Sequence, residues 1–242
     1  MNEVISQLYG RKSTRVFENR EIRAEDQEEI LNAAFAAPSA GCQQLYTVIR
    51  VTDPTLRETL AESCDHQPFI ATAKMILIFC ADVKKWYDAF VFAGCEPRKP
   101  AAGAFLLAVN DAVIAAQNAV TAAESLGIGS CYIGDIMENY EFHRKLLNLP
   151  EYVFPAAMLV FGYPTDQQKA RTKPRRAPKE LIVHENGYRP MEEAELQTLF
   201  SAYAGQREYG EWIRAFCKRK YNSDFSVEMS RSVNAFLNTL DE

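Results

Sequence analysis

The sequence predicts an α+β fold in which helices wrap a small central mixed β-sheet. Two apolar runs, 74–81 and 152–161, have the composition of strands, and the first is continuous enough for a central strand buried on both faces. Between them, 105–126 is almost entirely small or apolar and predicts a long buried helix. Strands and helices do not alternate regularly, as they would in a doubly wound parallel sheet.

The N-terminal part of the chain is expected to hold three helices and two strands. Apolar residues recur at helical spacing in the early segments, and Pro38 ends the second of them. The expected helices are 2–9, 24–37 and 55–63, and the expected strands are 45–51 and 74–81. After these, 88–100 mixes aromatic residues with glycine and proline, which predicts an irregular segment and a candidate lid.

The C-terminal part becomes helical after one more strand. Gly127 and Gly129 are expected to end the long helix. The elements that follow are strands at 131–133 and 152–161 and helices at 140–147, 192–204, 208–220 and 225–240. We therefore expect a domain over 1–190 and a helical extension over 191–242 that packs on the core or on a partner subunit. The apolar pattern of the long helix is equally compatible with burial inside a monomer and with burial against a second subunit.

Composition limits the classes of function. A formal net charge of −5 argues against a nucleic-acid-binding protein, which would carry a basic surplus. Six scattered cysteines without a Cys-x-x-Cys pair, and only three histidines, argue against a zinc site. The N-terminus lacks the pattern of a signal peptide, and Asn110 and Asp111 make the long helix too polar for a membrane span. We expect a reduced, cytoplasmic protein.

Two short basic stretches are the best candidates for a ligand site. They are Arg11-Lys12-Ser13-Thr14-Arg15 and the loop 169–179, which contains Lys173-Pro174-Arg175-Arg176. Paired Arg and Lys side chains with a neighbouring hydroxyl suit a phosphate monoester. In the first stretch we expect Arg11 and Ser13 at the phosphate and Arg15 pointing elsewhere, because alternate residues of an extended segment face apart. Each stretch taken alone also fits a solvated loop.

Two further segments bear on the site. In the turn after Pro38, small residues allow close approach to a ligand, and Gln44 offers the donors and acceptor that a heteroaromatic ring edge needs. The glycines at 127–134 superficially match a dinucleotide-binding loop, but they follow a helix and enter a strand, the reverse of that motif. No Ser/His/Asp or Cys/His set has a recognisable spacing, which favours chemistry carried by a cofactor.

Five strings in this order resemble the FMN-dependent nitroreductase and flavin-reductase family, specifically its larger NAD(P)H-using subgroup. They are R-K-S-T-R-V-F, A-P-S-A-G-C-Q-Q-L-Y-T-V-I, D-A-V-I-A-A-Q-N-A-V-T-A-A-E-S-L-G-I-G-S-C-Y-I-G, V-F-G-Y-P and the K-P-R-R loop. Together they cover residues 1–190. The resemblance implies a nitroreductase-like fold and an intertwined homodimer with two FMN molecules at the interface.

The resemblance also implies roles for individual residues. The FMN phosphate is expected at Arg11, Ser13, Lys173 and Arg175, with Lys12 close by. Arg15 is expected near the N1 and C2 carbonyl edge of the flavin. The other residues expected at the ring or its ribityl chain are Ser39 and Gln44 from the partner chain, Gln67, and the backbone groups of Tyr132, Ile133 and Gly134.

The implied activity is a ping-pong hydride transfer. NADPH or NADH reduces FMN at N5 and leaves, and a small-molecule acceptor then occupies the same face. Nitroaromatics, quinones and free flavins are the expected acceptors. No side chain is assigned as a catalytic acid or base, and the positive charge of Arg15 is expected to tune the flavin. Arg207 is a candidate for the 2′-phosphate of NADPH, with a solvated helix face as the alternative.

The chain departs from the family pattern in one loop. Cys42 stands where the family usually has Asn, and Leu45-Tyr46 replaces the usual Pro-Trp. These differences leave open a second hypothesis, a flavin-binding carrier or redox sensor without turnover. A third, a phosphopeptide- or RNA-binding module that uses the basic stretches, conflicts with the acidic net charge.

Overall fold

The computed structural model describes residues 1–240, and their contacts divide the chain into two compact units. The first unit comprises Met1–Arg171 together with the chain from Met229 on, and the second begins at Thr172 and ends at Glu228. This division differs from the predicted boundary at residue 190. The chain leaves the first unit earlier, and the end of the last helix returns to it.

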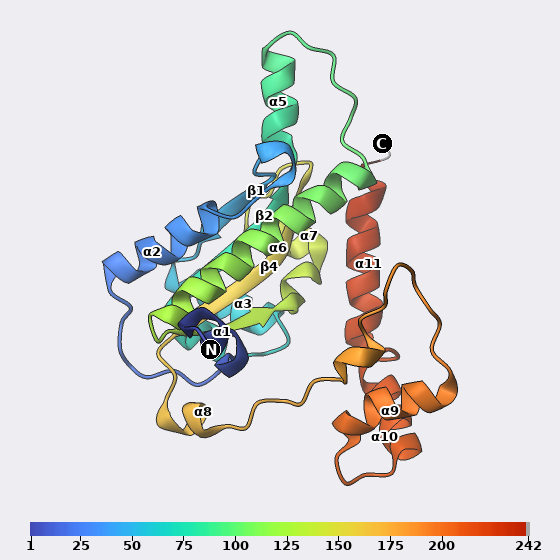
Figure 1. Ribbon diagram of the computed structural model, residues 1–242. Coiled ribbons are helices and arrows are strands. Elements are labelled where there is room, and N and C mark those ends of the chain that lie inside the picture. Colours follow the sequence, from blue (N-terminus) through green and yellow to red (C-terminus); the bar gives the residue numbers. More distant parts are fainter. Residues whose placement is uncertain (241–242) are drawn as a thin grey trace. The chain divides into compact units, whose positions relative to one another are not determined.

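The first unit is a sheet surrounded by helices (Figure 1). Its strands are β1 (Tyr46–Arg50), β2 (Met75–Asp82), β3 (Gly129–Ile133) and β4 (Val153–Gly162). Its helices and short turns are α1 (Glu3–Gly10), α2 (Ala24–Phe35), η1 (Ala40–Cys42), α3 (Pro54–Ser63), α4 (Phe69–Thr72), α5 (Lys84–Phe92), α6 (Ala102–Ser125), η2 (Gly134–Met137), α7 (Tyr140–Leu146) and α8 (Asp166–Ala170). The second unit holds η3 (Lys179–Leu181), α9 (Glu193–Ala204), α10 (Tyr209–Lys220) and the start of α11 (Asp224–Asn238).

The four strands form one sheet in the order β1-β2-β4-β3, and each neighbouring pair is antiparallel. The register pairs Met75 with Phe161 and Gly129 with Gly162. The α+β class is confirmed, but among the described residues the sheet is antiparallel and not mixed as predicted. Parallel pairing is confined to an isolated bridge between Ser13 and Ser130, because segment 11–15 adds to β3 along one residue pair only.

The two central strands explain why their sequences are apolar throughout. Every residue of β2 and β4 is buried. Leu77 and Phe79 pack into the cluster on the α6 face, whereas Ile76 and Ile78 pack into the cluster on the opposite face. Because successive side chains of a strand point to opposite faces, a strand covered on both sides needs apolar residues at every position. The prediction for 74–81 is confirmed.

Helix α6 packs on the sheet through a stripe of alanines. Ala108, Ala112, Ala115 and Ala119 are fully buried, and the small side chains allow a close approach to the sheet and to α2. Length and composition alone would let α6 cross a membrane, but the buried alanine face is that of a core helix. The other face is exposed and carries apolar side chains, so the chain itself covers only part of this helix.

Helix α5 differs from the sequence prediction, which expected an irregular segment over 88–100. The helix continues into that segment as far as Phe92, and Gly94, two residues further on, has a φ of +79°, a conformation that favours glycine. Pairs four residues apart stabilise it: the Lys84 ammonium lies 3.0 Å from the Asp88 carboxylate, and the Trp86 and Phe90 rings are 5.6 Å apart. The irregular segment therefore begins only after Phe92.

The end of α11 belongs to the first unit because it enters an aromatic cluster. The Phe236 ring lies 4.7 Å from Phe105 and 4.9 Å from Phe154, and Phe236 is 1% exposed. Ser232 is buried beside it, and its hydroxyl accepts a hydrogen bond of 3.0 Å from the Tyr140 backbone N–H. The C-terminal helix is therefore part of the core that carries the sheet.

Candidate functional site

The first basic stretch lies along the edge of the sheet. The Thr14 N–H donates a 2.9 Å hydrogen bond to the Ser130 carbonyl of β3. The approach is close because Gly129 has no side chain: a Cβ at that position would lie 2.8 Å from the Thr14 Cβ. Gly129 was expected only to end the long helix. It also seats the basic stretch against β3.

Arg11, Ser13 and Arg15 act on one residue of that strand, Cys131. Burial raises the pKa of the Cys131 thiol, whereas Arg15, a hydrogen bond with Ser13, and Arg11 act to lower it. Burial also raises the pKa of Tyr132 to about 12, against the opposing charge of Arg11. The structure therefore brings the three odd-numbered residues together. Arg15 is exposed whereas Arg11 and Ser13 are partly buried, and the expectation that Arg15 points away from the phosphate stays a prediction.

Lys12 faces the opposite way. Its ammonium donates hydrogen bonds to the carbonyls of Lys169 and Arg171, the second at 2.6 Å. Lys12 and Thr14 line a separate cavity of about 350 Å³ on that side. Lys12 thus ties the basic stretch to the chain that follows α8, and its charge is used within the protein.

Gln168 of α8 holds the same stretch from its backbone. Its amide nitrogen donates to the Ser13 carbonyl at 3.2 Å, and its amide oxygen accepts from the Arg15 N–H at 3.3 Å. The side chain is 2% exposed, so both groups depend on these partners. This residue was not predicted to take part in the site. A glutamine in a polar segment gives no signal of its own.

Two buried polar atoms at this edge have no hydrogen-bond partner among the described residues. They are the Arg11 Nε and the hydroxyl of Ser130, the β3 residue that pairs with Ser13. A buried donor left unpaired costs about 1–3 kcal/mol, and more when it is charged. An anionic group with several acceptor oxygens, such as a phosphate monoester, would pair with the guanidinium. The residues present therefore fit the phosphate of FMN.

Gln67, another predicted ligand, lies two residues before a ring that Arg15 approaches. The Arg15 guanidinium is 6.0 Å from the centre of the Phe69 ring, which follows Gln67 closely in the chain. The Gln67 amide nitrogen donates to the Cys64 carbonyl at 2.7 Å, which fixes the side chain. The backbone before it is strained, with φ of +61° at Asp65 and +49° at His66. Such strain is common where a segment is held in place for a ligand.

Of the residues predicted to line the flavin through their backbones, Tyr132 and Ile133 end β3 and Gly134 begins η2. Ile133 is buried, Tyr132 is partly buried, and Gly134 is exposed with open space around its Cα. The Tyr132 hydroxyl donates to the Gln117 side chain of α6 at 3.4 Å. They adjoin Cys131, so the structure places them with the basic stretch.

The predicted ring-contacting loop, 39–44, is built around a buried carboxylate. Asp111 of α6 is 2% exposed and accepts hydrogen bonds from the N–H groups of Ala40 and Leu45, at 2.9 and 3.0 Å. The Ser39 hydroxyl accepts from the Gln44 N–H at 3.0 Å, which closes the loop. Gly41, Cys42 and Gln44 all have positive φ values, near +50°.

A second clamp comes from α5. The Trp86 indole N–H donates a 2.7 Å hydrogen bond to the Gln43 carbonyl. From the sequence, Asp111 was noted only for its polarity, and Trp86 was not predicted to contact the loop. A carboxylate within an apolar helix was the signal that could have identified Asp111, because such a group needs donors from elsewhere in the fold.

The loop 39–44 and the basic stretch lie at different levels of α6. Arg11 lines a small cavity with Val120, Thr121 and Glu124. The loop instead bonds to Asp111, about 14 Å away along the helix at 1.5 Å per residue. Within one chain, Ser39 and Gln44 are therefore not brought to the residues around Cys131.

The remaining predicted ligands lie in the second unit. Lys173 is partly buried, and Arg175 and Arg207 are exposed. Arg207 is fixed locally, since its backbone N–H donates to the Ala204 carbonyl at 3.3 Å at the end of α9. The proposed phosphate roles of Lys173 and Arg175 and the proposed NADPH contact of Arg207 stay predictions.

The comparisons with known proteins match the part of the chain that carries most of these residues. Positions 8–163, which include the basic stretch, the loop 39–44 and β3, match the description "Nitroreductase family". The chain is 38% identical over 193 residues to the oxygen-insensitive NADPH nitroreductase of Salmonella typhimurium, covering 80% of this chain and 78% of that protein. It is 31% identical over 249 residues to an NAD(P)H FMN reductase of Bacillus subtilis, covering 99% and 93%.

Among solved structures, the chain is similar to the NADPH:FMN oxidoreductase of Vibrio harveyi complexed with NAD+. The TM-score is 0.83 at 26% sequence identity, and the match covers 98% of each chain. Since this coverage extends beyond residue 163, the likeness includes the helical C-terminal region.

Proposed function

Because the chain belongs to the nitroreductase family, we propose that it is an NAD(P)H-dependent oxidoreductase that uses FMN to reduce nitroaromatics, quinones or free flavins. The resemblance drawn from the sequence motifs is confirmed by the family match and by relatives named as NADPH nitroreductase and FMN reductase. The observation that carries the proposal is the unpaired Arg11 guanidinium nitrogen buried at the edge of β3.

Arg11 and Ser13 would hold the FMN phosphate. Both lie at Cys131, and the Arg11 Nε is buried without a partner among the described residues. A guanidinium binds phosphate through parallel N–H donors, and a hydroxyl adds a neutral donor. Lys12 would act indirectly, because its ammonium already serves the carbonyls after α8. The predicted contributions of Lys173 and Arg175 belong to the same proposal.

Arg15 would set the charge at the flavin ring. Bound FMN would supply the hydride-accepting and hydride-donating chemistry. The exposed Arg15 guanidinium lies by Phe69 and acts electrostatically on Cys131, so it offers a positive charge between Phe69 and β3. A fixed charge stabilises negative charge that develops beside it, and no proton-donating side chain is then required.

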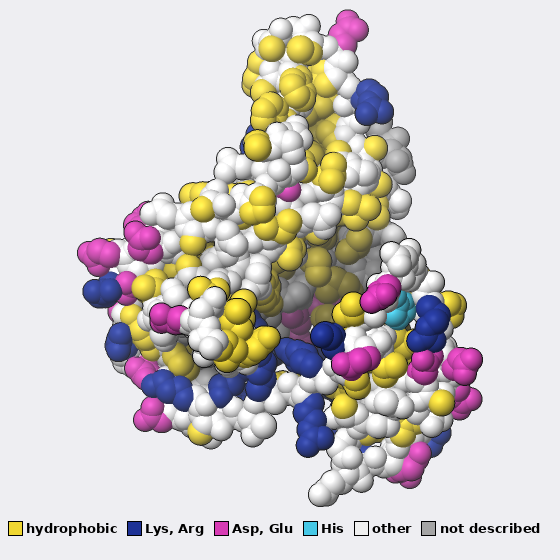
Figure 2. Space-filling view, in the orientation of Figure 1, with side chains coloured by type: hydrophobic (Ala, Val, Ile, Leu, Met, Phe, Trp, Pro, Cys, Tyr) yellow, Lys and Arg dark blue, Asp and Glu magenta, His cyan; other side chains and the backbone are white. Residues whose placement is uncertain are grey.

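The same proposal includes a homodimer. Helix α6 exposes the apolar side chains Leu106, Leu107, Val113 and Ile114, and Figure 2 shows hydrophobic side chains over α1, α5 and α6. A second copy would cover this face. It would also let Ser39 and Gln44, which are distant from Arg11 in one chain, reach the cofactor held by the other. A cytoplasmic location fits this activity.

The test is an anaerobic titration of the purified protein. We expect a yellow protein with bound FMN that NADPH or NADH bleaches, and that nitroaromatic, quinone or flavin acceptors reoxidise. Stopped-flow comparison of NADH with NADPH would measure the contribution of Arg207, whose replacement by Ala should weaken NADPH and leave NADH unchanged. A colourless protein that takes up no added FMN would refute the proposal, and FMN binding without turnover would favour a carrier or sensor.

A further inference from the structure

The chain that follows the basic stretch pairs with the chain that leads into α8. The Glu18 N–H donates to the Tyr163 carbonyl at 2.8 Å, and the Thr165 N–H donates to the Val16 carbonyl at 3.3 Å. The two segments therefore run antiparallel. At Asp166 the second segment turns into α8, where backbone groups bond within the helix. The backbone pairing consequently stops before it reaches the basic stretch.

Side chains continue the pairing from that point. Gln168 of α8 donates to the Ser13 carbonyl and accepts from the Arg15 N–H, at 3.2 and 3.3 Å. From the other segment, the Lys12 ammonium donates to two carbonyls at the end of α8. Each segment therefore sends one side chain to the backbone of the other. These bonds hold the basic stretch and α8 in one register.

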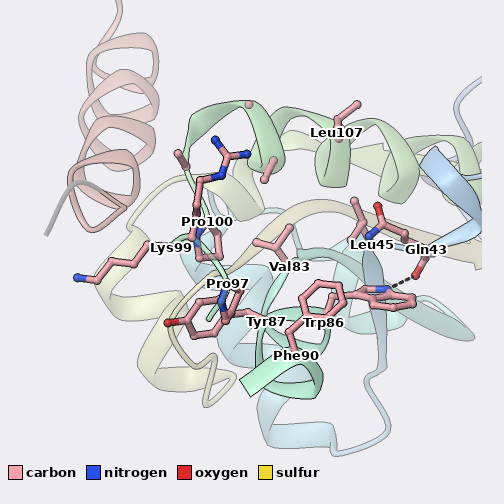
Figure 3. A pocket seen from close by; sticks show the side chains of 14 residues that line it. Gln43, Leu45, Val83, Trp86, Tyr87, Phe90, Pro97, Lys99, Pro100 and Leu107 are labelled. Carbon is pink, nitrogen blue, oxygen red and sulfur yellow. Dashed lines mark hydrogen bonds between the residues drawn. The ribbon is translucent and has the colours of Figure 1, made fainter. Parts of the chain in front are cut away.

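Gln168 differs from the other clamp of the candidate site. Trp86 holds loop 39–44 through the single hydrogen bond that Figure 3 draws to Gln43. Gln168 instead joins two residues with different proposed roles, Ser13 at the phosphate and Arg15 at the flavin ring. Its side chain is 2% exposed, so its amide depends on these two partners.

From this double contact we propose that Gln168 is a positioning residue for the flavin reaction. It fixes the backbone of Arg15 relative to Ser13, so that the phosphate contact and the positive charge fit one FMN molecule. Because Gln168 is buried and bonds to backbone groups, it acts on the reaction through the Arg15 guanidinium. The inference rests on the proposed function. The family match ends at residue 163 and does not include α8.

The first measurement needs no flavin. It is the exchange of the Arg15 amide proton with solvent, followed by NMR. Gln168→Met keeps the length of the side chain and removes both amide groups, and Gln167→Met is the matched control, because Gln167 is the exposed neighbour on the same helix. We expect the Arg15 amide to exchange about fivefold faster in Gln168→Met, the loss of one hydrogen bond, and to be unchanged in the control.

The second measurement uses the FMN-loaded protein. We expect Gln168→Met to slow flavin reduction by NAD(P)H by about fivefold, within the range of coupling in one hydrogen-bonded network. The midpoint potential of bound FMN should become more negative, because the charge that stabilises reduced flavin is displaced. In the Arg15→Ala background, the same substitution should change the rate by less than about twofold. The charge through which Gln168 acts is then gone.

A second variant keeps the test open if Gln168→Met does not fold. Gln168→Asn retains a buried amide but is one methylene shorter, so it cannot reach both Ser13 and Arg15. We expect it to show the same dependence on Arg15.

The proposal is overturned if exchange at Arg15 is unchanged, or if Gln168→Met slows reduction equally with and without Arg15. A loss of stability in urea without a change in rate or potential would also overturn it, because that is the signature of a purely structural role. Absence of FMN uptake by the unaltered protein would refute the proposed function, and the role of Gln168 in the reaction with it. FMN uptake with additive effects would overturn the role of Gln168 alone.

Discussion

Gly129 lies against Thr14 so closely that an added Cβ would be 2.8 Å from the Thr14 Cβ. This contact seats the basic stretch along β3 and so places Arg11, Ser13 and Arg15 around Cys131. A glycine in the first position of a strand thus determines where the cationic side chains of the candidate site lie.

The variant Gly129→Ala should therefore disturb the candidate site, although Gly129 itself is not expected to contact the ligand. The added methyl must displace Thr14, and we expect a loss of about 1–3 kcal/mol in the free energy of unfolding together with weaker FMN binding. Gly103→Ala is the control, because a Cβ there meets nothing within 4 Å and lies in a helix. Urea unfolding and flavin titration measure both effects. Equal behaviour of the two variants would contradict this role of Gly129.

Replacing Arg15 should affect mainly the rate of flavin reduction, and replacing Arg175 should affect mainly the affinity for FMN. Arg15→Ala should slow flavin reduction by about tenfold or more while FMN binding changes little, because the fixed charge acts on the reaction. Arg175→Ala should instead weaken FMN by about tenfold, the worth of a charged hydrogen bond. Arg50→Ala, which removes an exposed arginine bonded to Gln27, is the control. If both variants change both quantities equally, the division of roles is wrong.

Asp111 should be needed for the shape of loop 39–44. Asp111→Asn keeps one acceptor and leaves one of the two loop N–H groups unpaired, which should cost about 1–3 kcal/mol of stability and lower activity. Asp82→Asn is a matched control, since Asp82 is also buried but accepts from Thr47 and the Lys85 N–H, outside the loop. We expect the control to lose stability and keep its rate of acceptor reduction. Loss of that rate in both would remove the special role of Asp111.

Stability should fall as the pH drops below the ordinary pKa of histidine. Burial lowers the pKa of His143, which lies between the Glu138 carbonyl at 2.7 Å and the Ser63 hydroxyl at 2.9 Å. At about pH 6.5 the His143 side chain therefore binds a proton in the unfolded chain but not in the folded chain. The free energy of unfolding consequently rises with pH through this window. His143→Gln should flatten the slope between about pH 5.5 and 7.5.

His66→Gln is the control for the pH measurement. His66 is exposed, and its hydrogen bond with Glu62 raises its pKa, which stabilises the folded state on the acid side. In His66→Gln, the free energy of unfolding should still decrease as the pH falls, as steeply as in the unaltered protein or slightly more so. Retention of the full slope in His143→Gln would show that other groups cause it.

Most elements of the fold followed from local sequence patterns. Buried strands such as 74–81 and the alanine-rich helix have strong periodicity or composition, and the structure confirms them. Helix α5 was missed because its stabilising pairs, such as Trp86 with Phe90, lie next to glycine and prolines that predict a loop. The direction of strand pairing depends on long-range connections, and local composition does not encode it.

The site was predicted less completely than the fold. Motif resemblance identified Arg11, Ser13 and Arg15, which the structure brings together. It did not identify the residues that hold them, such as Gln168, because these act through backbone groups and depend on distant contacts. The expected orientation of Arg15 stays a prediction, and the Lys12 ammonium is bonded to backbone carbonyls that no local sequence pattern indicates.

The most direct measurement is the affinity of Arg11→Ala for FMN and for riboflavin, which lacks the phosphate. We expect FMN to bind about tenfold or more weakly to the variant, the free-energy contribution of a charged hydrogen bond to phosphate, and riboflavin to bind as it does to the unaltered protein. Unchanged FMN affinity, or an equal loss for riboflavin, would contradict the assignment of Arg11, with its unpaired Nε, to the phosphate.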